Sequence, residues 1–466
     1  MVFSSLTFIF AFFPAVLICY FIIPKRYRRA RNAVLLIFSL FFYLYGEPRG
    51  IFVMLLSITA NYLLALAIEK LPKRKLFLFL TAAVNLGVLC FYKYTGFFLE
   101  NINFIFNMKI NIPQIIMPIG ISFFTFQGMS YVFDVYNRDV PAQKNIFAVA
   151  LYISLFPQLV AGPIVRYQTV ADEIVSRDES VPLAYSGFRR FIIGLAKKMF
   201  LANSMGVIAT DIFARNPANL PAACAWLGAV AYSFQIFFDF SAYSDMAIGM
   251  GRIFGFHFLE NFNYPYISKS ITEFWRRWHM SLSTWFRDYV YIPLGGNRKG
   301  ILRQLFNILV VWSLTGLWHG ASWNFIAWGL YFAVILIIEK LFLGKLLKKA
   351  PAVISRVYTL LLIILGWVLF NSRDINYAFM YARAMFSHIP LDKTSLKQIL
   401  YYLNEYRLEF VLSLVFSTPI LRRLNEKYRN NKIFEYTAAA ALLVIFAFCI
   451  LSVVSSTFNP FIYFRF

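Results

Sequence analysis

Long apolar stretches separated by short charged loops dominate the pattern of hydrophobic and polar positions along the chain. About 20 apolar residues are needed for a helix to cross a lipid bilayer. Segments of this kind, some of them short or interrupted by Pro and Gly, lie at residues 3–23, 32–45, 51–68, 76–99, 115–133, 146–163, 188–212, 223–238, 242–256, 301–318, 323–343, 353–370, 408–421 and 437–456. The pattern predicts an all-α polytopic membrane protein with about 10 to 14 crossings, of which the short segments could be re-entrant or interfacial.

Other membrane architectures do not fit this pattern. A transmembrane β-barrel would show shorter segments in which apolar and polar residues alternate. The chain contains no internal repeat and no low-complexity linker. We therefore expect a single transmembrane domain that covers residues 1–466 and is surrounded by the lipid bilayer.

The composition agrees with a membrane protein, and it affects how the positive net charge is interpreted. Of the 466 residues, 60% are hydrophobic and 53 are phenylalanine, which is more than a soluble core of this size requires. Lys and Arg together number 45 against 22 Asp and Glu, for a net charge of +23. In a soluble protein this excess would suggest nucleic-acid binding. Here the basic residues cluster in short loops between apolar segments, where they set orientation, and no nucleic-acid partner is expected.

The basic loops predict which ends of the spans face the cytoplasm. Loops at 25–31, 70–75, 345–349 and 422–432 are rich in Lys and Arg and should be cytoplasmic. The first apolar segment precedes its basic run, the reverse of the order in a cleavable signal peptide, so we expect an uncleaved first span. If 301–318 and 323–343 both cross the membrane, the turn between them faces outward.

The stretch from 257 to 300 is the longest polar-rich region between apolar segments. Within it, aromatic and apolar residues recur at spacings of three and four, at Trp275, Trp278, Leu282, Trp285 and Tyr289. This spacing predicts one helix with an aromatic stripe, suited to the membrane interface. The following PLGGNRKG predicts a turn. It is not a phosphate-binding loop, because no GKS or GKT follows at the required spacing.

His319, within SLTGLWHGASWNF, is one of only four histidines and lies between two apolar segments. An ionisable residue at membrane depth favours a functional role, and imidazole can take and return a proton near neutral pH. The small residues Gly316 and Gly320 would allow backbone or substrate to approach closely. The alternative is a structural, hydrogen-bonded histidine. His279 lies 40 residues earlier, and spacing alone cannot show whether the two meet.

Other kinds of site receive less support. The four cysteines are isolated, no HExxH motif occurs, and no metal site is expected. No GxSxG elbow marks a serine nucleophile. The acids Asp239 and Asp245 lie in an apolar stretch. They could form a proton or ion site, support a catalytic histidine, or hydrogen-bond between helices.

Several long motifs are similar to those of a known family. EFWRRWHMSLSTWFRDYVYIPLGGNR and LTGLWHGASWNFIAWG, together with FPQLVAGPIVRY, FDFSAYSDMAIGMGRIFGF and the terminal NPFIYFRF, resemble the membrane-bound O-acyltransferase (MBOAT) family. Within it, they resemble the bacterial branch that includes alginate O-acetylation membrane proteins. The resemblance extends over essentially the whole chain.

The resemblance implies a fold and a reaction. The fold would be a ring of tilted transmembrane helices around a thin central tunnel, in a bacterial cytoplasmic membrane. An acyl thioester donor such as acyl-CoA would enter from the cytoplasmic side, with no bound cofactor. The acyl group, most simply acetyl, would pass outward to a polysaccharide or to an extracytoplasmic acetyltransferase.

The resemblance also assigns residues. His319 falls on the family's active-site histidine, and His279 falls on the second characteristic position, where it would orient the acceptor or stabilise the oxyanion. Candidates for the tunnel lining are Trp275, Trp278, Ser281, Arg287, Asp288, Trp318, Asp239 and Asp245. Residues that could attract the phosphates of the donor, or that could simply carry the positive charge of a cytoplasmic loop, are Arg276, Arg277, Arg287, Arg298 and Lys299.

Two alternatives to polysaccharide O-acetylation stay open. D-alanyl transfer to teichoic acid would use the same fold and chemistry with a carrier-protein donor. A polytopic transporter, in which Asp239 and Asp245 couple ions to substrate movement, would belong to a different class. Repeated halves with broken helices would favour the transporter, and the sequence shows no such halves.

Overall fold

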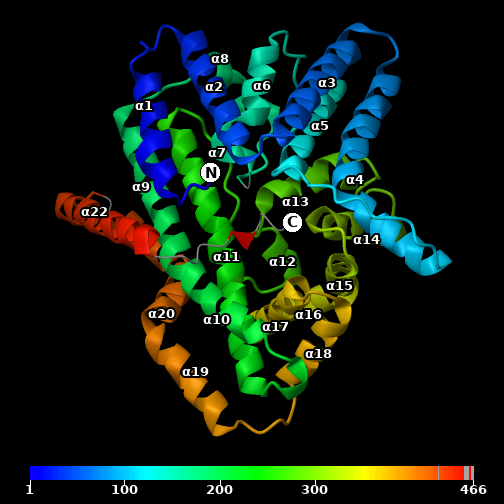
Figure 1. Cartoon of the computed structure of the whole chain (residues 1–466), viewed down its shortest axis with the longest axis vertical. Helices are drawn as coiled ribbons and strands as arrows, with labels where there is room; N and C mark the ends of the chain where they lie inside the picture. The colour runs from blue at the N-terminus through cyan, green and yellow to red at the C-terminus, as the bar shows by residue number, and fades with distance from the viewer. Residues whose placement is uncertain (161, 429, 456–460, 463–466) are drawn as a thin grey trace. The chain divides into compact units, whose positions relative to one another are not determined.

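Helices connected by loops make up the part of the chain that the computed structural model describes, residues 1–160, 162–428, 430–455 and 461–462 (Figure 1). No strand occurs in these ranges, which confirms the prediction of an all-α protein. Of the terminal NPFIYFRF motif, only Phe461 and Ile462 are described.

Contacts between Cα atoms divide the chain into two compact units, residues 1–191 with 243–260 and residues 192–242 with 261–466. Two helices, α9 (Val181–Ala196) and α11 (Ala222–Ile253), run from one unit into the other. The prediction of a single transmembrane domain stays a prediction.

The first unit contains the N-terminal helices. Besides part of α9 and α11, they are η1 (Thr7–Phe12), α1 (Phe13–Phe21), α2 (Arg28–Gly46), α3 (Gly50–Lys70), α4 (Arg74–Phe106), α5 (Ile121–Asn137), α6 (Ile146–Ser154), α7 (Phe156–Leu159) and α8 (Tyr167–Val175). Helices α3, α4 and α5 pack side by side (Figure 1).

The second unit contains the two candidate catalytic histidines. Besides the rest of α9 and α11, its elements are η2 (Lys197–Ala202), α10 (Asn203–Phe213), η3 (Pro217–Asn219), η4 (Pro265–Ile267), α12 (Ile271–Trp275), α13 (Met280–Phe286), η5 (Arg287–Tyr291), α14 (Ile301–His319), α15 (Trp323–Ile338), η6 (Glu339–Leu343), α16 (Gly344–Lys349), α17 (Ala352–Asn371), α18 (Ile375–Met385), α19 (Lys393–Glu405), α20 (Arg407–Phe416), α21 (Ile420–Tyr428) and α22 (Lys432–Ser455).

Eight helical segments in the described ranges are long and apolar enough to cross a membrane. They are Gly50–Lys70, Arg74–Phe106, Val181–Phe213, Ala222–Ile253, Ile301–His319, Trp323–Lys349, Ala352–Asn371 and Lys432–Ser455. The shorter apolar helix Thr7–Phe21 is not among them, and the predicted 10 to 14 crossings stay a prediction. The segments predicted at 223–238 and 242–256 form one helix, α11, and the segment at 146–163 is broken between α6 and α7.

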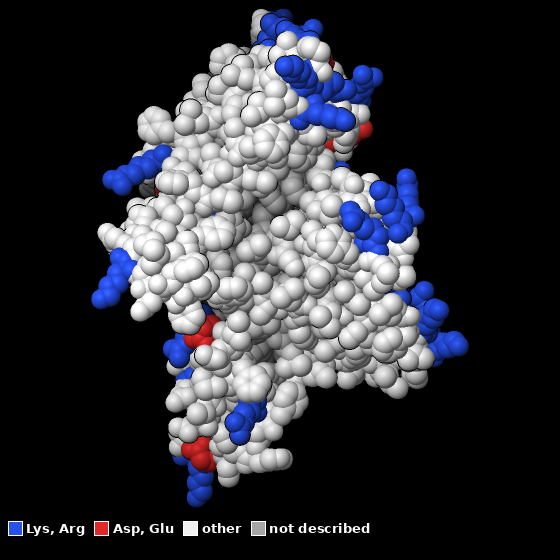
Figure 2. Space-filling view, turned by 90° about the vertical axis from the view of Figure 1, so that its right-hand side faces the viewer, with Lys and Arg blue, Asp and Glu red and all other residues white. Residues whose placement is uncertain are grey.

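The surface agrees with a protein surrounded by lipid. The face drawn in Figure 2 is mostly uncharged, and its Lys and Arg side chains gather in a few groups toward the edges. Large apolar side chains are exposed, including Phe79 at 68% and Phe104 at 88%. Apolar exposure on this scale would be unfavourable in water and suits contact with lipid tails.

The hairpin of α14 and α15 holds His319 at its turn. Its two helices approach closely at glycines: a Cβ added to Gly316 would lie 2.4 Å from the carbonyl oxygen of Phe325, and one added to Gly329 would lie 2.3 Å from that of Trp312. The small residues near His319 therefore admit the backbone of the neighbouring helix.

The predicted aromatic helix is not one helix, and this expectation was wrong. Helix α12 ends at Trp275 and α13 begins at Met280. Between them His279 adopts φ 44° and ψ 53°, in the left-handed region that interrupts an α-helix. The rings of Trp275, Trp278 and Trp285 are buried within the protein, so they do not face the lipid headgroups as an exposed aromatic stripe would.

Candidate active site

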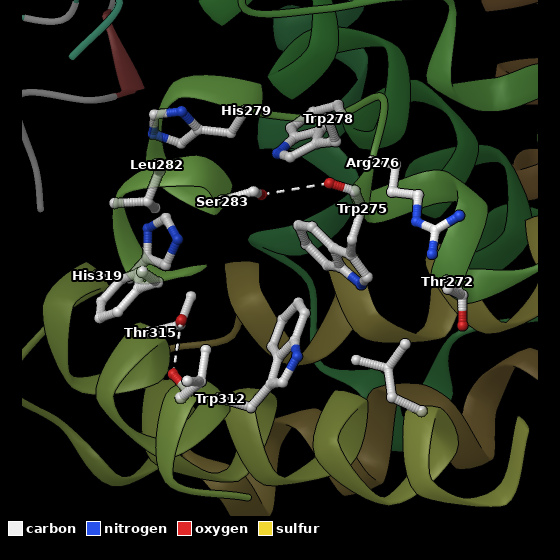
Figure 3. A pocket seen from close by; sticks show the side chains of 13 residues that line it. Thr272, Trp275, Arg276, Trp278, His279, Leu282, Ser283, Trp312, Thr315 and His319 are labelled. Carbon is white, nitrogen blue, oxygen red and sulfur yellow. Dashed lines mark hydrogen bonds between the residues drawn. The ribbon is translucent and has the colours of Figure 1, made fainter. Parts of the chain in front are cut away.

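Both histidines that the sequence singles out line one cavity of about 240 Å³ in the second unit. In Figure 3 His279 and His319 lie on the same side of the cavity, while Thr272 and Arg276 lie on the opposite side. The walls come from α12, α13, α14, α15 and the turn after α12, through Thr272, Trp275, Arg276, Trp278, His279, Leu282, Ser283, Phe286, Val311, Trp312, Thr315, His319 and Leu336. The fold thus brings together two residues that are 40 positions apart.

His319 is the last residue of α14 and is only 4% exposed. Its ring makes edge-to-face contacts with Trp328 at 5.0 Å and with Phe370 at 5.3 Å between ring centroids. Such contacts are favourable and directional. They hold the imidazole in one orientation at the wall of the cavity.

A short pairing of backbone segments fixes the turn that carries His279. The backbone N–H of Met280 donates to the carbonyl of Asn261 at 3.0 Å, and that of Asn263 donates to the carbonyl of Arg277 at 2.9 Å. A left-handed conformation is uncommon for a residue other than glycine and persists where its surroundings enforce it. These bonds on both sides of His279 provide that constraint.

The side chain of Asn261 determines which nitrogen of His279 carries the proton. Its Oδ1 accepts hydrogen bonds from the backbone N–H of Ser281 at 3.3 Å and from the Ser281 hydroxyl at 2.9 Å. Because a backbone N–H can only donate, the atom facing it must be the amide oxygen. His279 Nδ1, 3.2 Å from the same oxygen, is therefore the protonated nitrogen.

His279 is consequently a neutral imidazole with a basic Nε2. Burial disfavours the charged form and lowers the pKa of His279 to about 3. Nε2 has no hydrogen-bond partner among the described residues. This nitrogen can accept a hydrogen bond from a ligand hydroxyl, but it cannot donate one.

Sequence analysis missed several other residues of the cavity wall. The hydroxyl of Ser283 donates to the carbonyl of Trp275 at 3.2 Å, and that of Thr315 donates to the carbonyl of Val311 at 2.8 Å (Figure 3). Trp312 packs against Trp275 with 4.7 Å between ring centroids. The signal that could have found Trp312 and Thr315 is their helical spacing to His319, which places all three on one face of α14.

Glu339 was also missed, although it anchors one wall of the cavity. This buried carboxylate at the end of α15 accepts hydrogen bonds from the backbone N–H groups of Ile271 at 2.7 Å and Thr272 at 2.8 Å, and from the Thr272 hydroxyl at 2.6 Å. The first amides of a helix have no partner within the helix. Glu339 satisfies two of them and fixes the start of α12.

The structure separates the other sequence-predicted candidates into two groups. Trp275 and Trp278 line the cavity, and Trp318 packs against His279 at 5.9 Å between ring centroids. Ser281 is not part of the lining but hydrogen-bonds to Asn261. Arg287 and Asp288 form an ion pair with each other at 2.6 Å and do not line the cavity.

The two buried acids have basic partners. Asp239 Oδ1 lies 2.6 Å from Lys198 Nζ, and its Oδ2 accepts the backbone N–H of Ile462 at 2.7 Å. Asp245 belongs to the first unit and pairs with Arg190 at 2.8 Å. These contacts give each carboxylate a stabilising role within its own unit.

As for metal binding, no three His, Cys, Asp or Glu side chains are grouped to hold an ion in the described ranges.

Comparison with known proteins identifies the family. Residues 140–370, which include the whole cavity lining, match the MBOAT, membrane-bound O-acyltransferase family. The chain is 37% identical over 504 residues to the "probable alginate O-acetylase AlgI" of Azotobacter vinelandii, and the match covers 100% of both chains. The chain belongs to the MBOAT family. It is therefore a membrane-bound O-acyltransferase, as the motifs predicted.

Two further relatives of this MBOAT protein carry different names. It is 31% identical to the "peptidoglycan O-acetyltransferase" of Helicobacter pylori, over 100% of this chain and 98% of the relative. It is 30% identical to the "teichoic acid D-alanyltransferase" of Bacillus subtilis, over 57% of this chain and 71% of the relative. The relatives are bacterial, and this one is a multi-pass membrane protein by its helices.

Proposed function

We propose that this MBOAT protein transfers an acetyl group from a cytoplasmic thioester across a bacterial cytoplasmic membrane, for O-acetylation of an extracytoplasmic polysaccharide. The observation that carries the proposal is the cavity wall shared by His279 and His319, in a chain that matches O-acetylases over its whole length. The helices would form the family's ring around a thin centre, and the cavity would be the middle of its tunnel.

His319 acts as the proton-transferring residue in this proposal. A hydroxyl oxygen of the acceptor attacks the thioester carbonyl while His319 removes the hydroxyl proton. As the new C–O bond forms, the C–S bond breaks and the proton passes to the leaving thiolate. General acid–base catalysis of this kind typically contributes about 10²–10⁴-fold, and holding donor and acceptor together adds an entropic advantage.

His279 orients the acceptor. The resemblance implied two roles for His279. Stabilising an oxyanion requires an N–H that donates a hydrogen bond, whereas orienting the hydroxyl of the acceptor substrate requires a nitrogen lone pair that accepts one. The hydrogen bond to Asn261 and the lowered pKa of His279 both favour a neutral ring with an accepting Nε2. The geometry thus supports orientation of the acceptor hydroxyl.

The polysaccharide could receive the acetyl group directly or through an extracytoplasmic acetyltransferase. D-alanyl transfer is the second candidate, supported by the match to a teichoic acid D-alanyltransferase over 57% of the chain. O-acetylation is favoured because the O-acetylase relatives match the whole chain. The ion pairs of Asp239 and Asp245 offer no free carboxylate for the transporter alternative.

Deletion of the gene tests the proposed function. We expect the deletion strain to lose ester-linked acetyl from its cell-envelope polysaccharide, and a copy of the wild-type gene to restore it. The measurement is acetate released by mild alkali, with ester-linked D-alanine measured in the same samples. Unchanged acetate together with loss of D-alanine would contradict O-acetylation and select the second candidate.

A matched pair of asparagine substitutions tests the role of His279. Asn261→Ala removes the acceptor of three hydrogen bonds, so the proton of His279 is no longer held on Nδ1. We expect acyl transfer to fall by about 10- to 100-fold, since a lost buried hydrogen bond is worth roughly 1–3 kcal/mol. Asn263→Ala, in the same segment but on an exposed side chain, should leave the rate within about twofold of wild type.

The pH dependence of a third variant separates positioning from simple stability. Asn261→Asp keeps an acceptor for Nδ1–H, but a carboxylate there favours the imidazolium form and raises the pKa of His279. Protonated Nε2 cannot accept a hydrogen bond, so the rate should fall relative to wild type as pH drops through the raised pKa, which lies between about 4 and 6. A variant whose rate tracks wild type from about pH 4 to pH 7 would contradict this role.

A further inference from the structure

A large groove lies within the first unit. It has a volume of about 1040 Å³ and is formed by the loop before α2, the first turns of α2, the start of α6 and the end of α8. Helices α2 and α6 pack against each other, and in Figure 1 the loop between α1 and α2 lies at the end of this unit where α6 and α8 are drawn. The groove shares no lining residue with the histidine cavity, so it is a separate hollow.

The rim of the groove is basic. Arg26, Arg28 and Arg29 line it, and no Asp or Glu is among its lining residues. Arg26 and Arg29 are exposed, and neither has a carboxylate within ion-pair distance in the described part of the chain. Helix α2 begins at Arg28 with no side-chain cap and no acid in its first turn, so the positive end of the helix dipole adds to these charges. The groove would therefore attract an anion.

The third arginine, Arg28, belongs to a cluster of charges beside the groove. Its guanidinium and those of Arg31 and Arg177 all contact the carboxylate of Glu179. Nη2 of Arg28 lies 3.1 Å from Oε2 of Glu179. One negative charge thus faces three positive charges. Glu179 holds Arg28 in place, but it does not neutralise the groove.

Large apolar side chains line the same groove. Ile37, Phe147 and Val175 are 64%, 68% and 69% exposed. Ile37 follows Arg28 by nine residues on α2, which is roughly 14 Å along the helix axis. A water-soluble anion would leave these side chains uncovered, whereas burial of apolar surface is favourable. A ligand with an anionic end and an apolar chain would match both parts of the lining.

The basic loops indicate on which side of the membrane the groove lies. The loop at 25–31, which supplies two of the arginines, is predicted to be cytoplasmic. Arg74, in the predicted cytoplasmic loop at 70–75, donates to the backbone carbonyl of Tyr136 at 2.6 Å. The end of α5, from which the chain leads into α6, therefore lies on the same side. The cytoplasmic leaflet carries anionic lipids, which attract basic segments next to the membrane.

We propose that this groove binds an anionic phospholipid of the cytoplasmic leaflet, with the headgroup phosphate at Arg26 and Arg29 and an acyl chain along Ile37 and Phe147. Asn145, which also lines the groove, adds a neutral donor. Its Oδ1 accepts the backbone N–H of Phe147 at 2.9 Å, which leaves its amide N–H groups for the headgroup. The volume of about 1040 Å³ is at the upper end of the range for small-molecule sites. The proposal does not rest on the proposed acyl transfer.

Lipid binding to the purified full-length protein in detergent tests the groove. The variant combines Arg26→Gln and Arg29→Gln, and the probe is dioleoylphosphatidylglycerol. Because both exposed charges at the phosphate are lost, we expect its Kd, measured by native mass spectrometry, to rise by about 10- to 30-fold. The zwitterionic dioleoylphosphatidylcholine should bind wild type and variant equally weakly. Equal affinity of variant and wild type for phosphatidylglycerol would overturn the proposal.

Two control variants make the result specific. Lys73→Gln with Lys75→Gln removes the same charge from another loop predicted to be cytoplasmic, and should change the Kd for phosphatidylglycerol less than twofold. Arg26→Lys with Arg29→Lys keeps the charge, and should bind within about threefold of wild type. A loss of affinity in the Lys73 and Lys75 variant as large as in the groove variant would show that only the overall charge matters, and would overturn a defined site.

The apolar part of the lining distinguishes a lipid from a free phosphate. Phe147→Ser leaves the arginines in place but removes an apolar contact, so it should raise the Kd for phosphatidylglycerol by about 3- to 10-fold. Glycerol 3-phosphate has the phosphate without acyl chains, and should not displace the lipid even at a hundredfold excess over the lipid's Kd. If glycerol 3-phosphate displaces the lipid near that Kd, and Phe147→Ser binds like wild type, the groove takes a soluble anion and the lipid assignment is overturned.

Discussion

Replacing His319 by alanine is expected to lower acetylation by at least about 10²-fold, because the acceptor hydroxyl then has no base to receive its proton. The measurement is the rate of acetyl transfer, with alkali-released acetate in a complemented deletion strain as the cellular counterpart.

Two further variants make this result interpretable. His319→Gln fills more of the space left by the ring between Trp328 and Phe370, so it should fold like wild type and yet remain inactive. His388→Ala, at an exposed position outside the cavity, should keep full activity. If His319→Ala and His319→Gln both transfer acetyl within about twofold of wild type, His319 is not the base.

Replacing Glu339 by alanine is expected to cause the largest loss of stability. Two backbone amides of α12 and the hydroxyl of Thr272 would lose their acceptor in a buried place, which costs about 3–5 kcal/mol in all. Helix α12 carries Thr272 and Trp275, so the cavity wall should loosen and activity should fall together with stability. The measurement is the thermal unfolding midpoint in detergent, which we expect to drop by several degrees.

Comparison with other glutamates gives this prediction its contrast. Glu339→Gln keeps one acceptor oxygen, so its unfolding midpoint should lie between those of Glu339→Ala and wild type. Glu426→Ala removes an exposed ion pair with Arg422, which is worth only about 0.3–0.5 kcal/mol. Equal unfolding midpoints for Glu339→Ala and Glu426→Ala would show that the carboxylate does not hold α12.

The hydrophobic pattern predicted the helical architecture because each helix needs its own run of apolar residues to sit in lipid. The division of the chain into separate helices was harder to predict, since a run of apolar residues does not reveal whether neighbouring runs join. Residues 223–238 and 242–256 read as two segments because Asp239 interrupts them. The structure pairs this acid with Lys198, so one helix continues through it.

The break at His279 could not be predicted from local sequence. The three residues before His279 are Arg276, Arg277 and Trp278. None of them is a Pro or Gly that would signal the end of a helix, and the aromatic spacing favours a continuous helix. The cause is tertiary: Asn261 and Asn263 pair with the turn from outside it. Sequence analysis singled out both histidines. It missed Asn261 because this residue has no periodic relation to them and meets His279 only in the folded chain.

Glu339 illustrates a second limit of sequence reasoning. It stands beside Lys340 near the end of an apolar segment, where a charged residue ordinarily marks the edge of the membrane. Only the packing of α12 against α15 reveals that its partners are backbone amides. The signal that was available is modest: an acid inside a stretch otherwise rich in Lys.

The size of the histidine cavity has a consequence for the length of the transferred acyl chain. Its volume of about 240 Å³ is below the roughly 300–1,000 Å³ of sites that enclose drug-sized molecules. Trp275, Trp278 and Trp312 form part of its wall. The ring of Trp275 packs against that of Trp312, and the ring of Trp278 packs against that of Trp367. Such a wall cannot widen without breaking aromatic contacts on several helices at once. We expect a two-carbon group to fit beside the histidines, whereas a fatty acyl tail would have to displace the indoles, which agrees with the proposed transfer of acetyl.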